Sequence, residues 1–342
     1  MINIPANATT AQIKSLIIKG GEFKFASNVK YKLTDTIKIP SNTKINLNGS
    51  SLRRYHSGPL LRLVDSKNIS GYGGTHDVTI TNGTLEGMNG SAYPYSPNSL
   101  LTMFHAKNIT LTNVKFLDIP GCHAIDCCAC KNVTIKNCKF EGYYSVGNDF
   151  REAIQVDYGY YGGLPTYAKG SPCYDMTRCD TITIDGCSFG KSKTFPAQYI
   201  AIGGHTIGCD NKYHTNIVIK NCTAEGNGGK NGTDTGFISI ANFKNITITN
   251  NKIKNYNRFI LVRRVDKTYD KDSNIKDKSL QKNVVNLTVK DNTIESHKGV
   301  AARWGIYCDV TLADGITVAN NKGMTEESCY IKGKNLNIKY VK

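Results

Sequence analysis

A repeated block of alternating apolar and threonine residues restricts the fold of this chain more than any other feature of its sequence. The block reads apolar–Thr–apolar, is often opened by Asn, and has the period-two alternation of a β-strand with one buried face. Its copies begin at Asn108, Asn132, Thr181, Asn216, Asn245, Asn286, Gly315 and, in truncated form, Asn335. Neighbouring copies are spaced by about one solenoid turn, or by a turn plus an insertion, so the sequence predicts a chain that winds.

A second class of apolar strands alternates with these blocks. Its members are Ala124 to Asp126, Ala153 to Asp157, Ile200 to Ile202, Phe237 to Ile240 and Phe259 to Val262. Two long strands and one short apolar step per turn predict an all-β fold, a single-stranded right-handed parallel β-helix. We expect residues 1–65 to form an N-terminal cap and the first turns, with a helix at 11–19 and strands at 30–39 and 43–47. Residues 66–342 would then form one continuous β-helix domain.

Composition restricts the class of partner. With 39% hydrophobic and 20% charged residues, the chain is typical of a folded protein rather than a disordered one. The net charge of +16 is spread along the sequence, which predicts an anionic partner but no nucleic acid. No apolar stretch approaches the ~20 residues of a membrane span, and the first residues lack the pattern of a signal peptide. We therefore expect no membrane insertion.

The cysteines and asparagines of the repeat have a structural interpretation. Cys138, Cys187 and Cys222 occupy one repeat position, which predicts a ladder of buried free thiols rather than metal ligands. The segment 127–130, Cys-Cys-Ala-Cys, resembles half a zinc site, but strand alternation would point Cys127 and Cys128 to opposite faces. We predict no metal and no cofactor. The Asn-x-Thr triplets are expected to form asparagine ladders at the turns.

Polar residues gather on one face of the second strand class. Aligning these strands on their central isoleucines places five polar residues in one solvent-facing stripe. The five are Asp126, Gln155, Asp157, His205 and Arg263. His123, Glu152 and Arg258 lie two residues before the aligned isoleucines and would reach the same side only from a corner of the turn.

Carboxylates in this stripe predict acid–base chemistry. Adjacent turns lie ~4.8 Å apart, so the Cα atoms of Asp126 and Asp157 would be roughly 8 Å apart. A separation of that order suits a carboxylate pair around a sugar linkage, although it does not separate inversion from retention. Glu152 competes with Asp126 for a catalytic role, and His205 could assist. The candidate catalytic residues are therefore Asp126, Glu152, Asp157 and His205.

Two long insertions, at 158–179 and 203–214, fall beside this stripe and are expected to wall a groove. Tyrosines concentrate in the first insertion, where they could contact sugar rings or pack on one another. Arginines could hold an acidic group of the ligand. The candidate substrate-binding residues are His123, Gln155, Tyr158, Tyr160, Tyr161, Arg151, Arg258 and Arg263.

Several blocks resemble a known family. Glu152-Ala153-Ile154-Gln155-Val156-Asp157 and Gly204-His205-Thr206, together with 39–43 and 105–110, resemble the pectin-lyase-like right-handed parallel β-helix proteins. Within that family the similarity is to polygalacturonase-related glycan-degrading proteins of bacteria and phage tails. The order of sites is also similar to that of polygalacturonases, with Asp126 near the first block, Glu152 and Asp157 near the second, His205 in the third, and Arg258 or Arg263 near the fourth.

The resemblance implies glycan cleavage on this face. The predicted function is a glycoside hydrolase that depolymerises a bacterial surface polysaccharide or a teichoic-acid-like polymer, anionic in either case. It would act as a phage tail spike on the virion tail, or extracellularly, and as a homotrimer. Two alternatives remain open: a polysaccharide lyase that acts on a uronic-acid polymer, often with Ca²⁺, and a non-catalytic glycan-binding adhesin.

Overall fold

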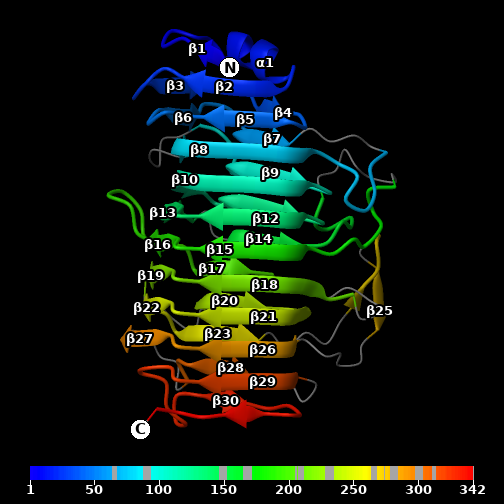
Figure 1. The fold of residues 1–342 in the computed structure, drawn as a ribbon, viewed down its shortest axis with the longest axis vertical. Coiled ribbons are helices and arrows are strands. Elements are labelled where there is room, and N and C mark those ends of the chain that lie inside the picture. The colour runs from blue at the N-terminus through cyan, green and yellow to red at the C-terminus, as the bar shows by residue number, and fades with distance from the viewer. Residues whose placement is uncertain are drawn as a thin grey trace.

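The computed structural model describes residues 1–63, 68–87, 94–145, 152–164, 172–204, 206, 212–227, 235–262, 268–272, 274–277, 284–296, 303–309 and 313–341. The chain winds along one long axis, with the N-terminus at one end and the C-terminus at the other (Figure 1). A typical turn has three strands, as in β11 (Ile125–Cys128), β12 (Lys131–Lys136) and β13 (Lys139–Tyr144). The predicted right-handed parallel β-helix is confirmed.

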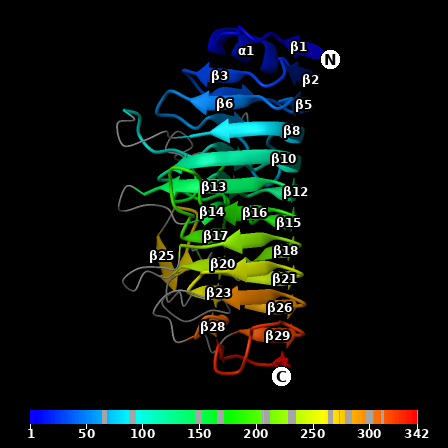
Figure 2. The same cartoon turned by 90° about the vertical axis from the view of Figure 1, so that its left-hand side faces the viewer.

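Two parallel sheets run the length of this axis (Figures 1 and 2). Among the described residues, the ten-stranded sheet contains β4 (Ile37–Ile39), β7 (Leu61–Leu63), β9 (Leu101–Phe104), β11, β14 (Glu152–Asp157), β17 (Ile200–Gly203), β20 (Gly236–Ile240), β23 (Arg258–Val262), β28 (Ile306–Cys308) and β30 (Tyr330–Ile331). These strands include the second strand class of the sequence. Their register pairs Ile125, Ile154, Ile202, Ile238 and Ile260 in order, so the predicted alignment is confirmed.

The repeat blocks form the longer sheet, which has 19 strands in the part of the chain that the structure describes. They are β1 (Ile2–Ile4), β2 (Gly21–Phe25), β3 (Lys30–Leu33), β5 (Thr43–Asn46), β6 (Ser51–Arg54), β8 (His76–Glu86), β10 (Lys107–Pro120), β12, β13, β15 (Asp180–Asp185), β16 (Ser188–Gly190), β18 (His214–Lys220), β19 (Thr223–Glu225), β21 (Phe243–Thr249), β22 (Lys252–Lys254), β26 (Val284–Lys290), β27 (Thr293–Ser296), β29 (Asp314–Ala319) and β31 (Asn337–Ile338).

The N-terminal end is closed by α1 (Thr10–Ile17). Thr9 and Gln12 form a reciprocal capping box at its start, and Ile13 and Ile17 are buried against the first turns. The predicted cap helix is therefore confirmed. The strand expected over residues 30–39 is wrong in one respect: it is divided into β3 and β4, which belong to different sheets because the chain turns a corner between them. The boundary at residue 65 stays a prediction.

Side chains of one kind stack from turn to turn inside the helix. Phe116, Phe140 and Phe189 are buried with ring centroids 4.9 and 4.7 Å apart and interplanar angles of 3° and 7°. The predicted thiol ladder is also present, because Cys138, Cys187 and Cys222 are all free and buried. The backbone N–H of Cys222 donates to Asn251 Oδ1 (2.9 Å), and amide-to-amide bonds then continue the ladder through Asn292 and Asn321.

A second asparagine ladder runs along the outside at the strand starts. Asn132 donates to Asn108 Oδ1 (2.8 Å) and Asn286 donates to Asn245 Oδ1 (3.0 Å), as the repeat predicts. All four have φ between 54° and 57°, in the left-handed region. Asparagine tolerates that region better than other side chains that have a Cβ atom, so the fold requires it at these corners for its backbone as well as for its amide.

The buried ladder should contribute much more stability than the exposed one. Asn292 Nδ2 donates to the backbone oxygens of Ile248 and Lys290, and Asn292 Oδ1 accepts from Asn251. Asn292→Ala leaves these buried groups unpaired and is expected to lower the free energy of unfolding by about 2–4 kcal/mol. Asn132→Gly keeps the left-handed backbone and should change it by less than about 0.5 kcal/mol. Urea unfolding checks both values, and equal losses would contradict the assignment.

One excursion leaves the helical body. β24 (Thr268–Tyr269) and β25 (Ile275–Asp277) form an antiparallel pair that stands on the side of the ten-stranded sheet, level with β20 along the axis (Figures 1 and 2). The backbone N–H of Tyr161 donates to the oxygen of Lys271 in this hairpin (2.9 Å). The described residues include no helix with the length and apolarity needed to span a membrane.

Candidate functional site

The outward-facing positions of the ten-stranded sheet form one continuous row. Lys38, Arg62, Thr102, Asp126 and Gln155 are consecutive Cα partners, one from each of five adjacent turns. Their neighbours in sequence, such as Ile125 and Ile154, lie in the core. The row is straight because every turn here repeats the same alternation. It therefore places the side chains of distant segments next to each other on one surface.

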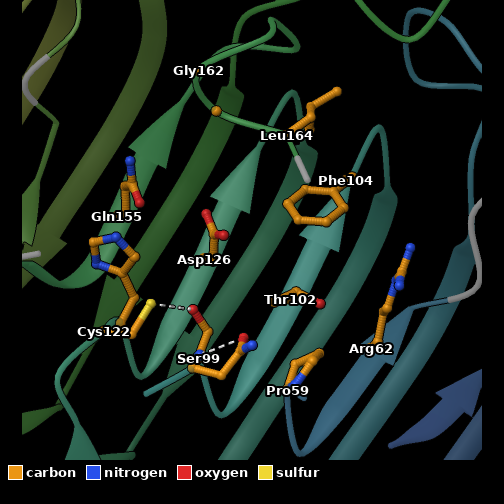
Figure 3. A pocket seen from close by; sticks show the side chains of 13 residues that line it. Pro59, Arg62, Ser99, Thr102, Phe104, Cys122, Asp126, Gln155, Gly162 and Leu164 are labelled. Carbon is orange, nitrogen blue, oxygen red and sulfur yellow. Dashed lines mark hydrogen bonds between the residues drawn. The ribbon is translucent and has the colours of Figure 1, made fainter. Parts of the chain in front are cut away.

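A pocket of about 280 Å³ lies over this row. Asp126 is at its centre, between Thr102 and Gln155, with Arg62 at one side (Figure 3). The lining residues are Pro59, Arg62, Asn98, Ser99, Thr102, Phe104, Cys122, His123, Asp126, Gln155, Gly162, Gly163 and Leu164. The pocket thus combines a cation, a carboxylate, two amides and two hydroxyls with a few apolar surfaces. This combination is typical of sites that bind polar ligands.

Thr102 supplies a buried hydroxyl to the pocket. Its side chain is 6% exposed, and its hydroxyl oxygen has no hydrogen-bond partner among the described residues. A buried hydroxyl without a partner costs stability. Because this hydroxyl lines the pocket, it is a natural partner for a ligand hydroxyl or a water molecule.

Gln155 and Asp157 were expected to face solvent, and this expectation is wrong. Both lie on the outward side of β14, as predicted, but they are only 5% and 1% exposed. The segment 158–164 folds back over the sheet, where Leu164 packs with Phe104 and Cys128 on the outer face. The insertion therefore covers part of the predicted stripe as well as walling the pocket.

The Asp157 carboxylate is held firmly. Its Oδ2 accepts from Gln155 Nε2 (3.0 Å) and from Thr206 Oγ1 (3.4 Å), and its Oδ1 accepts from the backbone N–H of Tyr158 (2.8 Å). These bonds compensate the cost of burying the charge. Asp157 lies two residues beyond Gln155 on the outward side of β14 and does not line the pocket.

Cys128 lies near both Asp126 and Asp157. It comes two residues after Asp126 on β11 and is the Cα partner of Asp157 on the next turn. The Cys128 thiol lies 3.2 Å from both Asp126 Oδ1 and the backbone oxygen of Gly163. Burial first, and then the charges of Asp126 and Asp157, raise the pKa of Cys128 well above its usual value. Burial also raises the pKa of Cys122, in the pocket wall, to about 11. Both side chains are therefore thiols at neutral pH and lack nucleophilic character.

His123 lies before β11 and Glu152 lies within β14, and only His123 reaches the pocket. His123 lines the pocket, and its Nδ1 lies 2.7 Å from the backbone oxygen of Glu152. Glu152 is 2% exposed and does not line the pocket, and its competition with Asp126 for a catalytic role stays a prediction. Glu152 is the first residue of β14, a strand that is buried along its whole length.

Most of the candidate tyrosines pack within the protein. Tyr158 is fully buried, lies 4.1 Å from the His214 ring and donates from its hydroxyl to the backbone oxygen of Lys212 (2.6 Å). The Tyr160 hydroxyl is 3.0 Å from Thr206 Oγ1. Neither lines the pocket, so packing is the role that the structure shows for them, and their contact with sugar rings stays a prediction. Tyr161 is 39% exposed at the outer surface of the same segment.

Of the predicted arginines, Arg258 lies among the described residues, and it does not line the pocket. Arg258 begins β23, three turns beyond Glu152 in register, and its guanidinium carbon lies 4.7 Å from the centroid of the Tyr307 ring. Arg151, His205 and Arg263 lie outside the described residues.

Sequence reasoning missed most of the pocket lining, including the polar residues Arg62, Thr102 and Asn98. Arg62 and Thr102 were outside the aligned strands because the alignment began at Ile125. Extending it by two turns, to Leu61 and Leu101, would have found both residues at the position of Asp126. Asn98 precedes β9 in an irregular segment, and no sequence period could have placed it.

The described cysteines of the segment 127–130 follow strand alternation. Cys127 lies in the core and Cys128 on the outer face, as strand alternation predicts. Cys127 Sγ is 4.0 Å from Cys179 Sγ, and the Cys179 backbone N–H donates to His214 Nδ1 (3.0 Å). Across the described ranges, no three His, Cys, Asp or Glu side chains are arranged to hold a metal ion.

Sequence comparison finds one informative similarity, and no protein-family profile matches the chain. The chain is 25% identical over 230 residues to plasmin and fibronectin-binding protein A of Streptococcus pneumoniae. The match covers 59% of this chain and 31% of that protein, so the chain spans about a third of its curated relative.

Structural comparison supports the fold. The crystal structure of PfbA, a surface adhesin of Streptococcus pneumoniae, superposes with a TM-score of 0.69 at 18% identity, over 97% of this chain and 78% of PfbA. A polygalacturonase of Erwinia carotovora gives 0.58 at 13% identity, over 99% and 96%. The tailspike of Escherichia coli bacteriophage HK620, solved with a pentasaccharide, gives 0.57 at 12% identity, over 94% and 54%. The chain therefore has the fold of the pectin-lyase-like, right-handed parallel β-helix proteins, which glycan-active proteins and an adhesin share.

Proposed function

We propose that this chain binds an anionic polysaccharide of a bacterial surface in the pocket centred on Asp126. The observation that carries the proposal is the row of Arg62, Thr102 and Asp126, which brings a cation, a hydroxyl and a carboxylate to one floor. Carboxylate and amide groups bind sugar hydroxyls, and a guanidinium binds a carboxylate or phosphate of the polymer. The structural neighbours support a glycan ligand, since one was solved with a pentasaccharide.

Thr102→Val tests the proposal. Valine keeps the shape of threonine but removes the hydroxyl, so polysaccharide binding should weaken by about 1 kcal/mol, or roughly fivefold in Kd. The free energy of unfolding should stay the same or rise, because a buried hydroxyl without a partner is removed. Calorimetry with purified wall polysaccharides, teichoic acids, polygalacturonate and neutral dextran measures the first effect, and urea unfolding measures the second.

Thr134→Val is the matched control, because Thr134 lies on β12 of the longer sheet and does not line the pocket. It should leave Kd unchanged. Equal affinity of the wild type and Thr102→Val for every polymer would contradict a ligand in this pocket.

Hydrolysis of the bound polymer is the second candidate function. It is favoured by the second carboxylate, because Asp157 lies one turn from Asp126 and two positions further along the strand. This geometry places the two Cα atoms roughly 8 Å apart, within the range of glycosidase carboxylate pairs. Asp126 would donate a proton to the glycosidic oxygen as a general acid, or accept one from the attacking water as a general base. Asp157 could take part only if the segment 158–164 moves away, because that segment now covers it.

The setting of the protein is also a proposal. The similarity to a streptococcal surface adhesin and to a phage tailspike supports an extracellular location, either at a cell surface or on a virion tail. We propose a homotrimer, as expected from the family resemblance. Light scattering behind size exclusion would return three times the 37.6 kDa chain mass if this is correct, and the chain mass itself if it is not.

A further inference from the structure

The outward row that carries the pocket continues to the C-terminal end of the ten-stranded sheet. Beyond Gln155 the consecutive Cα partners are Gly203, Ser239, Leu261, Tyr307 and Tyr330. Gly203, Ser239 and Leu261 are buried, whereas Tyr307 and Tyr330 are half-exposed. The row is therefore accessible at two separate places, the pocket and its last two turns.

These last turns carry a cluster of aromatic and cationic side chains, Arg258, Tyr307, Tyr330 and Lys332, which we name the C-terminal platform. The tyrosine rings stack with centroids 5.6 Å apart and an interplanar angle of 27°. Arg258 lies over Tyr307 at 4.7 Å, and Lys332 Nζ lies 5.0 Å from the Tyr330 centroid. Asp309 pairs with Lys332 (2.6 Å), so two cations and one anion leave the platform with a net positive charge.

The platform is arranged in advance of any ligand. Stacking between turns fixes both rings, and the Arg258 guanidinium is held by a bond to the backbone oxygen of Arg303 (2.9 Å). Because the ring faces stack on each other, a ligand would meet the ring edges and hydroxyls, of which the Tyr330 hydroxyl also interacts with Lys332. Phenol hydroxyls beside a fixed guanidinium suit an acidic sugar, whose hydroxyls and carboxylate or phosphate would be bound together.

We propose that the C-terminal platform is a second binding site for acidic polysaccharide, distinct from the Asp126 pocket. Five turns separate Asp126 from Tyr307 in register, or roughly 24 Å at ~4.8 Å per turn. Since the row between them is buried, one polymer would reach both sites by passing outside the covering segments. Binding at two places raises the affinity for long polymers above that for short ones. The inference shares the proposed glycan ligand but not the pocket, so the two can fail separately.

The test compares long and short ligands. The variant combines Arg258→Gln, Tyr307→Phe and Tyr330→Phe, which removes a charge and two hydroxyls but keeps the ring stack. It should bind long polygalacturonate about tenfold more weakly, while its affinity for a trigalacturonate that fills only the pocket stays unchanged. Poly(glycerol phosphate) as a second arm shows whether a phosphate serves in place of a carboxylate, and neutral dextran is the control polymer.

A second measurement does not depend on ligand binding in the pocket. Trp304 is the single tryptophan of the chain and comes three residues before Tyr307, so its fluorescence reports on the platform. Acidic polymer should change this fluorescence in the wild type and not in the triple variant, with equal melting temperatures for both proteins. The platform proposal would be wrong if the triple variant bound long polymer as tightly as the wild type and acidic polymer left the Trp304 fluorescence of the wild type unchanged. It would also be wrong if neutral dextran changed that fluorescence as much as acidic polymer does. If Thr102→Val binds normally while Trp304 still responds, the platform stands and the pocket proposal fails.

Discussion

Phe140→Ala is expected to lower the free energy of unfolding by about 3–5 kcal/mol. Phe140 is the middle ring of the buried stack with Phe116 and Phe189, so its removal leaves a cavity between two turns and exposes a face of each neighbouring ring. In a solenoid each turn contacts only its neighbours, and the cavity therefore weakens both interfaces of one turn. Urea unfolding followed by circular dichroism measures the loss, and hydrogen exchange should show the largest increase in β13 and β16.

Phe195→Ala is the control for this prediction. Phe195 is half-exposed in the loop after β16 and meets Tyr144 edge-on at 5.2 Å. Its truncation should cost less than about 1 kcal/mol. If both variants lose the same stability, the aromatic stack does not stabilise the fold more than a surface contact does.

The strand pattern was predictable because the same physical demand repeats on every turn. The aligned isoleucines of the second strand class, from Ile125 to Ile260, face the core, and the repeat blocks begin at residues with a left-handed backbone. The corner at 34–36 was not predictable, because residues 30–39 keep the alternation of a single strand while the chain turns between two sheets. The alternation of apolar and polar residues shows which face of a strand is buried, but it does not show to which sheet the strand belongs.

The candidate site was predictable only in its register. Alternation correctly placed Asp126, Gln155 and Asp157 on the outward side of the sheet. It could not show that Leu164 and Tyr160 come back over that side, because contacts between an insertion and a sheet follow no period. The exposed part of the row consequently lies nearer the N-terminus than expected, where Arg62 and Thr102 accompany Asp126. An acidic residue on an outward face is therefore a candidate for catalysis only where nothing folds over it.

If the protein hydrolyses its ligand, Asp126→Asn should lower the rate of reducing-end release by roughly 10²–10⁴-fold. Asparagine keeps the size and much of the hydrogen bonding of the side chain but cannot exchange a proton, so Kd for the polymer should change only a few fold. Asp126 lines the pocket whereas Asp157 and Glu152 do not, which is why the effect is expected at this position. Glu141→Gln, on β13 of the longer sheet, is the control and should retain full activity.

The Asp157→Asn variant tests whether Asp157 supports the structure or takes part in the reaction. Its new amide N–H₂ would face the donors Gln155 Nε2 or Tyr158 N–H, so both stability and activity should fall, whereas Asp126→Asn should spare stability. Reducing ends without ultraviolet absorbance would establish a hydrolase, and absorbance from unsaturated products would establish a lyase. Binding without any product at high protein concentration would identify an adhesin. In an adhesin the carboxylate only holds the sugar, so its replacement by an amide would change Kd and no rate.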